Sequence, residues 1–106
     1  MDHGQEAPAM DEPPTTRRRV QIVNTYGLHM RPSTRFVKLA SSFVSDIQVH
    51  FREITANGKS ILEMTCLAAE RGSELDLEAR GPDADAAIAA LADLVAAGFH
   101  MDEEGA

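Results

Sequence analysis

Three stretches of the chain alternate hydrophobic and polar residues, which is typical of β-strands with one buried and one exposed face. They cover residues 17–25 (RRRVQIVNT), 45–53 (SDIQVHFRE) and 73–80 (SELDLEAR). A fourth, shorter strand is predicted over residues 53–57, where the chain returns after the second stretch. Strands buried on both faces read as continuous apolar runs, so this alternation favours an antiparallel sheet covered on one face only.

Two other stretches repeat apolar residues every three or four positions, as amphipathic helices do. The first follows Pro32, and the second is GPDADAAIAALADLVAAGF at residues 81–99. Both begin with a proline, which suits the first turn of a helix, and the second ends with a glycine, which is common just after a helix. A third, short helix is predicted from Ser60 through about Leu67, because SILE has the form of a capping box.

The order of elements is therefore β-α-β-β-α-β-α. We expect an α+β fold, an open-faced two-layer sandwich in which a four-stranded antiparallel sheet is covered on one face by three helices. Residues 1–16 lack periodicity and contain three prolines, so they are expected to form a disordered leader. The folded domain would span residues 17–101, followed by an acidic tail at 102–106.

Charge and composition narrow the classes of function. The 106 residues carry a net charge of −7, but residues 17–101 hold all ten basic residues and are neutral overall. A neutral body argues against nucleic-acid binding, and we interpret the cluster Arg17–Arg19 as a solvated strand edge. Cys66 is the only cysteine and no apolar run could span a bilayer, so we expect a cytoplasmic protein without membrane insertion.

The sequence YGLHMRPST at residues 26–34 places a histidine where the first helix begins. His29 falls at the N-cap or one residue from it, where backbone N–H groups lack helical acceptors and the helix dipole is positive. This field favours an uncharged ring with a free lone pair, and the N–H groups suit an anion attached to it. Arg31 adds a cation suited to phosphate oxygens, and Gly27 permits a positive φ if the loop must aim the ring.

These features indicate a histidine that accepts a phosphoryl group and gives it away. A histidine near a helix start can also be a simple cap or a surface residue, and the residues alone leave these interpretations open. An anion-binding enzyme is a further hypothesis, but no Asp or Glu lies closer to His29 in sequence than Glu12 and Asp46. The four histidines and one cysteine show no metal-ligand spacing, so no metal site is expected.

The motif GLHMRP at 27–32 resembles the active-site signature of HPr, the histidine-containing phosphocarrier of the bacterial phosphotransferase system. The segments NGKSI at 57–61 and GPDADAA at 81–87 are also similar to that family. The likeness extends from about Val20 to Phe99, and the order of elements agrees with the HPr fold.

The resemblance implies that His29 receives a phosphoryl group on Nδ1 from enzyme I, which is itself phosphorylated by phosphoenolpyruvate. His29 would pass it to the A domain of a sugar permease, or to a nitrogen-related counterpart. Arg31 would steady the phosphate, while Pro32 and Ser33 would support the phosphate and the helix start. The chain would then be a monomeric carrier without a cofactor, and not an enzyme.

Ser60 aligns, by the same resemblance, with a serine that HPr kinase/phosphorylase modifies in part of the family. The residues alone explain Ser60 as a helix cap that contributes about 1 kcal/mol. Glu63 departs from the kinase-regulated members, which often have a small residue there, and its carboxylate would repel a phosphoserine. Both interpretations stay open. The alternative function is accordingly a regulatory docking module controlled by phosphorylation at Ser60, although the pairing of His29 with Arg31 favours the carrier.

The resemblance also implies an exposed apolar surface that docks partner proteins. We assign four residues to it: Met30, Thr34, Ile61 and Leu62. Methionine suits such a surface because its side chain adapts to different contacts. We expect Met64 and Leu67 in the core, and Cys66 as a small buried or half-buried residue.

Overall fold

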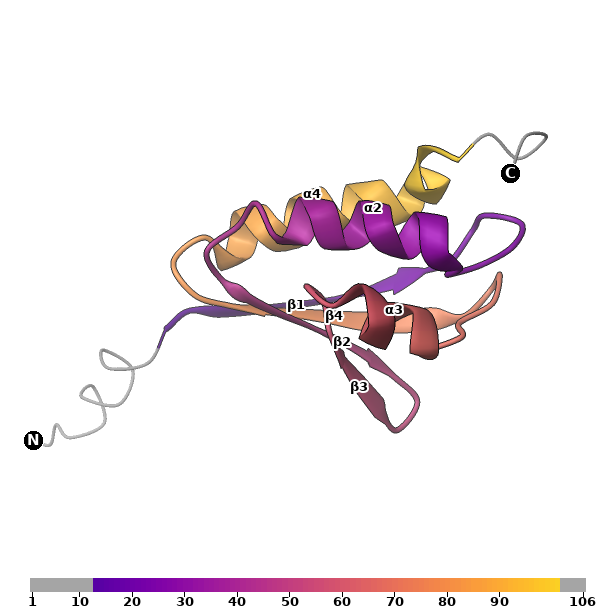
Figure 1. Ribbon diagram of the computed structural model, residues 1–106. Helices are drawn as coiled ribbons and strands as arrows, with labels where there is room; N and C mark the ends of the chain where they lie inside the picture. Colours follow the sequence, from indigo (N-terminus) through magenta and orange to yellow (C-terminus); the bar gives the residue numbers. More distant parts are fainter. Residues whose placement is uncertain (1–12, 102–106) are drawn as a thin grey trace, which may run out of the picture.

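The structure, a computed structural model that describes residues 13–101, is an antiparallel sheet with α-helices on one face (Figure 1). The strand order across the sheet is β1-β4-β2-β3. The predicted open-faced sandwich is confirmed. Its elements are β1 (Thr15–Gln21), α2 (Met30–Ala40), β2 (Asp46–Phe51), β3 (Ile54–Asn57), α3 (Ile61–Cys66), β4 (Glu74–Arg80), α4 (Ala84–Ala96) and the 3₁₀ turn η2 (Gly98–His100).

Strand β1 begins two residues before the boundary that its apolar pattern predicted. Thr15 pairs with Arg80 and Thr16 with Ala79, in one continuous register with β4. The expected boundary rested on apolar side chains, which start at Val20, whereas ladder hydrogen bonds need only the backbone. Residues 1–12 of the expected leader and the whole expected tail, 102–106, lie outside the described residues.

The predicted alternation of β2 and β4 is confirmed. Val49 pairs with Leu77 across the two strands, and both side chains are fully buried beneath the helices. The other inward residues of these strands are Ile47, Phe51, Leu75 and Ala79. Burial of each large apolar side chain contributes roughly 1.5–3 kcal/mol, so these two central strands hold much of the core.

Helices α2 and α4 lie side by side above the sheet (Figure 1). Phe36 of α2 and Phe99, just after α4, are the largest fully buried side chains. Both helices turn their predicted apolar stripes toward the sheet, with Leu91 and Val95 of α4 at 0% exposure. Within residues 13–101, none of the helices has the length and apolar character needed to cross a membrane.

The short helix α3 begins as predicted but is anchored differently. The Ser60 hydroxyl accepts a hydrogen bond from the Glu63 amide at 3.1 Å. The Glu63 carboxylate does not return to Ser60; it accepts from the Asn57 amide at 2.8 Å. Only one half of the capping box is therefore formed, and the other half fastens the helix to the end of β3.

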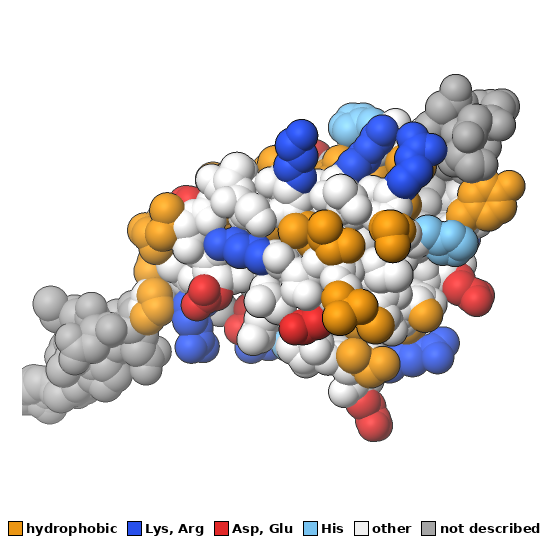
Figure 2. All heavy atoms as spheres, viewed as in Figure 1, with side chains coloured by type: hydrophobic (Ala, Val, Ile, Leu, Met, Phe, Trp, Pro, Cys, Tyr) orange, Lys and Arg blue, Asp and Glu red, His pale blue; other side chains and the backbone are white. Residues whose placement is uncertain are grey.

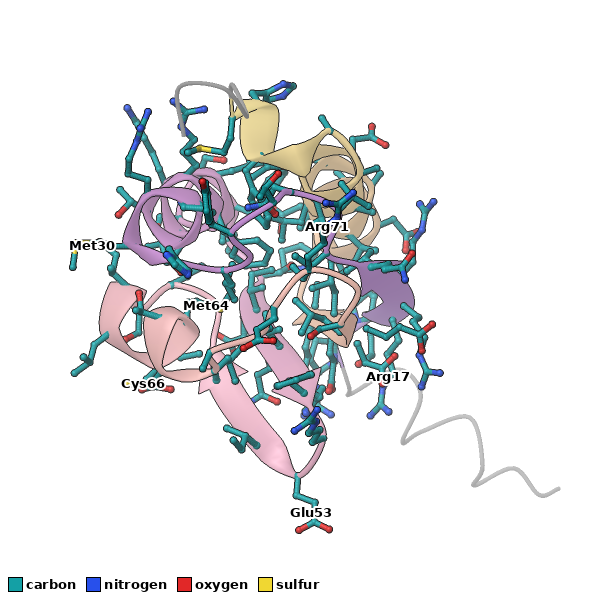
Figure 3. All side chains as sticks on the ribbon, turned by 90° about the vertical axis from the view of Figure 1, so that its right-hand side faces the viewer. Arg17, Met30, Glu53, Met64, Cys66 and Arg71 are labelled. Atoms are coloured by element: carbon teal, nitrogen blue, oxygen red, sulfur yellow. The ribbon has the colours of Figure 1, made fainter. Side chains whose placement is uncertain are left out.

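Helix α3 buries Met64 but leaves Cys66 exposed, so our expectation for Cys66 was wrong. Figure 3 shows Met64 pointing in toward α2 and the sheet and Cys66 on the outer side of α3. Two residues on a helix differ by about 200° in direction, so a six-residue helix that buries Met64 turns Cys66 outward. Leu67, one residue further, is buried as predicted.

The uncovered face of the sheet bears cross-strand charged pairs. Arg19 donates to both carboxylate oxygens of Asp76, at 2.9 and 3.2 Å. The ring Nε2 of His50 donates to Glu78 at 2.8 Å, and Arg17 lies 3.5 Å from the same carboxylate. The His50 hydrogen bond, with help from Arg17, holds the pKa of Glu78 below its ordinary value although burial opposes this.

Candidate functional site

His29 caps the start of α2 with its backbone alone. Its φ and ψ of −79° and −172° are extended, and its carbonyl accepts the Ser33 amide at 2.9 Å. The side chain makes no capping hydrogen bond, and the residue is exposed. The predicted N-cap position is confirmed, while a role as a side-chain cap is excluded. The imidazole is therefore free to react with a partner in solution.

The loop that presents His29 is held by a backbone hydrogen bond to a distant segment and by a side-chain hydrogen bond within the loop. The Leu28 amide donates to the Ala69 carbonyl at 2.8 Å, and the Asn24 side-chain amide donates to the Gly27 carbonyl at 2.8 Å. Gly27 has a φ of +72°, and a Cβ there would lie only 2.5 Å from the Ala69 oxygen. Glycine is thus required both for the turn and for the close approach to residue 69.

An open depression of about 480 Å³ lies against the His29 ring, lined in part by Asn24, Tyr26 and Met101. The ring centroids of Tyr26 and His29 are 6.3 Å apart with a tilt of 43°, an ordinary geometry for an aromatic pair. Asn24 is 4% exposed, and its Oδ1 has no partner within the described residues. The sequence patterns did not assign these three residues to the site: Asn24 and Tyr26 lie in the β1–α2 loop that carries His29, and Met101 comes from the segment after η2.

Arg31 lies at the edge of this depression with its guanidinium unpaired among residues 13–101. The first turn of α2 includes the Met30 and Arg31 amides, which have no helical acceptor, and holds no acidic residue. The positive end of the helix dipole therefore meets solvent next to His29. An anion bound to the ring would find two amides and a guanidinium within reach of this helix start.

Pro32 and Ser33 are both buried under the first turn. The Ser33 hydroxyl donates to the Leu28 carbonyl at 3.4 Å, and its amide donates to His29. Since both groups of Ser33 have partners and the side chain is fully buried, the residue supports the helix start and leaves no group for a phosphate. Pro32 has no N–H to leave unpaired, which suits this position.

The four expected docking residues are all exposed. We call Met30, Ile61 and Leu62 the apolar patch; they are 65%, 41% and 74% exposed. Figure 2 shows hydrophobic side chains gathered over α3 and the start of α2, beside a histidine. Figure 3 shows Met30 pointing away from the molecule. Thr34 lies one turn after Met30 and donates its hydroxyl to the Met30 carbonyl at 2.8 Å.

Ser60 lies at the N-cap of α3, next to two members of the apolar patch, and is half-buried. In the described part of the chain, no group of three or more His, Cys, Asp or Glu is placed to hold a metal ion. The groups that the structure places together at the site are one imidazole, one guanidinium and the backbone amides at the start of α2.

Comparisons with known proteins agree with this geometry. Residues 16–97 match the family described as the PTS HPr component phosphorylation site. The phosphocarrier protein HPr of Neisseria meningitidis is 39% identical over 79 residues, which are 74% of this chain and 89% of the relative. The phosphocarrier protein NPr of Proteus mirabilis is 37% identical over 89 residues, 83% of this chain and 99% of the relative.

Solved structures show the same fold. The crystal structure of HPr-C-His from Thermoanaerobacter tengcongensis superposes with a TM-score of 0.78 at 37% identity, covering 82% of this chain and 98% of that one. An HPr from Bacillus anthracis gives 0.74 at 37% identity, covering 76% and 96%. On the match to the family and to these relatives, the chain belongs to the HPr family of phosphocarrier proteins of the phosphotransferase system.

Proposed function

We propose that the chain accepts a phosphoryl group on His29 from phosphorylated enzyme I and passes it to an A-domain acceptor of the sugar, or nitrogen-related, phosphotransferase system. In the first transfer, the Nδ1 lone pair of His29 forms a bond to phosphorus while the bond to the donor histidine breaks. The electron pair of the broken bond returns to the donor ring. The second transfer repeats this exchange with His29 as the donor.

The observation that carries the proposal is an exposed imidazole without a hydrogen-bond partner among residues 13–101, set at a helix N-terminus whose first amides lack helical acceptors and beside an arginine unpaired in the same range. Backbone amides and Arg31 would stabilise the charge on the phosphoryl oxygens, with no reorganisation during transfer. His29 supplies the nucleophile, and the rest of the carrier contributes positioning, since an in-line transfer between two rings needs chiefly alignment. An open site serves this better than a closed one, because the other protein must reach the phosphorus.

The apolar patch supports a shared docking surface for the donor and the acceptor. Met30 adjoins His29 in the chain, and Ile61 and Leu62 lie on the neighbouring helix. A small patch gives short-lived complexes, which a carrier needs because it must leave the donor before it meets the acceptor. The partners are inferred from the family, whose members act with other proteins of the phosphotransferase system.

Incubation with phosphoenolpyruvate and enzyme I, followed by intact mass measurement, tests the proposal. Wild type should gain one acid-labile phosphoryl group, and His29→Ala should gain none. His50→Gln is the matched control, because it removes a histidine on the opposite face of the sheet and should leave the labelling unchanged. Equal labelling of wild type and His29→Ala contradicts the proposal. Arg31→Met should slow transfer by roughly tenfold or more, the effect of losing a hydrogen bond to a charged group.

Phosphorylation of Ser60 is the second candidate, in which the chain acts as a regulated docking module. What favours it is the position of Ser60 directly before Ile61 and Leu62, where a phosphate would place negative charge beside the apolar patch. The nearby Glu63 carboxylate opposes it by repulsion. An ATP-dependent kinase extract should give acid-stable labelling of wild type and none of Ser60→Ala. Absence of labelling with a cognate extract leaves Ser60 as a cap only.

A further inference from the structure

The chain ends its described part in an unusual left-handed turn. Gly98, Phe99 and His100 have φ angles of +64°, +59° and +57° in succession. Left-handed backbone is ordinary for glycine, but it is uncommon for other residues and a strained conformation for a bulky aromatic one. Such strain persists only where the surroundings enforce it, so the contacts of this turn indicate what it is for.

Two contacts enforce the turn. The Phe99 side chain is fully buried, which fixes the middle of the turn in the core. Arg35, 64 residues away on α2, donates from Nη1 to the carbonyls of Phe99 and His100, each at 2.9 Å. These are charge-assisted hydrogen bonds to carbonyls at the end of a turn, where a cation also meets favourable dipoles.

The turn lies at the end of the molecule where α2 begins. Figure 1 shows this C-terminal segment at the same end of the molecule as the loop that enters α2. Met101 follows the turn, is half-buried against the core and lines the depression beside His29. The turn directly precedes Met101 and so sets where this wall of the depression lies.

We propose that Arg35 is a positioning residue for His29: it holds the strained turn at residues 98–100 against α2 and thereby keeps Met101 as a wall of the phosphoryl site. This deepens the proposed function and rests on it for the role toward His29. Arg35 does not touch the ring or the phosphate. Its effect passes through Met101, which lines the same depression as His29 and would limit the access of water from that wall.

Methionine oxidation by dilute hydrogen peroxide, read by peptide mass spectrometry, tests the structural half of the proposal. Met101 is the reporter, Met30 is the exposed reference, and Met64, at 0% exposure, reports any global unfolding. Arg35→Met should speed Met101 oxidation by about fivefold, which corresponds to losing one net hydrogen bond of about 1 kcal/mol. Lys38→Met removes an equal charge from the same helix and should change nothing, while Arg35→Lys should restore part of the protection.

The half-life of phosphorylated His29 in the same variants tests the functional half. It should shorten in Arg35→Met, recover in part in Arg35→Lys and stay at the wild-type value in Lys38→Met. A wild-type oxidation rate of Met101 in Arg35→Met overturns the proposal, and an unchanged half-life despite faster oxidation contradicts the role toward His29. If Met64 also reacts in Arg35→Met, Arg35→Gln takes its place with the same increase expected. Failure to phosphorylate wild type would reject the proposed function, and the oxidation rates would still decide the role of Arg35.

Discussion

Substitution of Gly27 by alanine has two energetic costs: left-handed backbone for a residue with a Cβ, and a close contact between that Cβ and the backbone of residues 69 and 70. At Gly27 a Cβ would lie 2.5 Å from the Ala69 carbonyl oxygen and 2.9 Å from the Glu70 Cα, with φ at +72°. Gly72 is the matched control, because its φ of +91° imposes the same kind of backbone strain while a Cβ there meets nothing within 4 Å. The pair therefore isolates the close approach of the His29 loop to residue 69.

The expected magnitudes follow from these distances. Gly72→Ala should destabilise by about 1–2 kcal/mol, the cost of left-handed backbone for an alanine. Gly27→Ala adds a contact roughly 1 Å shorter than an optimal non-bonded separation, against backbone atoms that cannot rotate away. Relief requires moving the loop, which adds about 1–3 kcal/mol and endangers the Leu28–Ala69 hydrogen bond. The total of about 2–5 kcal/mol is a large part of the stability of a small domain.

Urea unfolding of the two variants measures the free energies of unfolding, and the rate of phosphoryl transfer measured under native conditions gives the effect on the site. We expect Gly27→Ala to be less stable than Gly72→Ala by at least about 1 kcal/mol and to transfer more slowly, because His29 lies two residues after the displaced glycine. Equal unfolding energies for the two variants would refute the reasoning, since the close approach to Ala69 would then cost nothing.

Three further changes test other parts of the structure. Ser60→Ala removes the acceptor of the Glu63 amide and should lower the free energy of unfolding in urea by about 1 kcal/mol. Ser60→Asp should restore most of that stability, because a carboxylate also caps a helix. Glu78→Gln should make the free energy of unfolding depend less steeply on pH in the acid range. The folded pKa of Glu78 is lowered, so the stability that its carboxylate contributes is present above the ordinary pKa of 4.5 and is lost as pH falls through the folded pKa. A profile as steep as that of wild type would exclude Glu78 and its His50 hydrogen bond as a source of acid sensitivity. Met64→Ala should cost about 2–5 kcal/mol by leaving a cavity, while Cys66→Ala on the same helix should cost less than about 0.5 kcal/mol; comparable thermal unfolding shifts for the two would contradict their assigned burial.

The strands and the long helices could be predicted from the sequence because their patterns are local. Alternation along β2 and β4 and the apolar stripe of α4 depend only on which residues face the sheet. Cys66 was misplaced because its expected burial rested on the usual burial of cysteine rather than on its position in the helix. Met64 was expected in the core, and a residue two positions later on a helix points about 200° away, which turns Cys66 outward.

The residues of the site also differ in whether a local pattern in the sequence predicts them. His29, its N-cap position and the neighbouring Arg31 could be predicted because they share one short segment with the proline that begins the helix. Ser33 looked equally suited to a phosphate, but its side chain turns inward to the Leu28 carbonyl. Arg35 meets the segment before Met101 through a left-handed turn of Gly98, Phe99 and His100. Gly98 is a sequence signal for the end of α4, but left-handed backbone at Phe99 and His100 leaves no mark in the sequence.

The hydrogen bond from Leu28 to Ala69 also bears on the order in which the molecule assembles. It joins segments separated by some forty residues, with two strands and two helices between them. Closing a loop of that length costs entropy that only the finished sheet offsets, so we place the presentation of His29 late in folding. In a nascent or partly unfolded chain, His29 would lack the loop and helix start that position it. Only fully folded molecules would therefore take part in phosphoryl transfer.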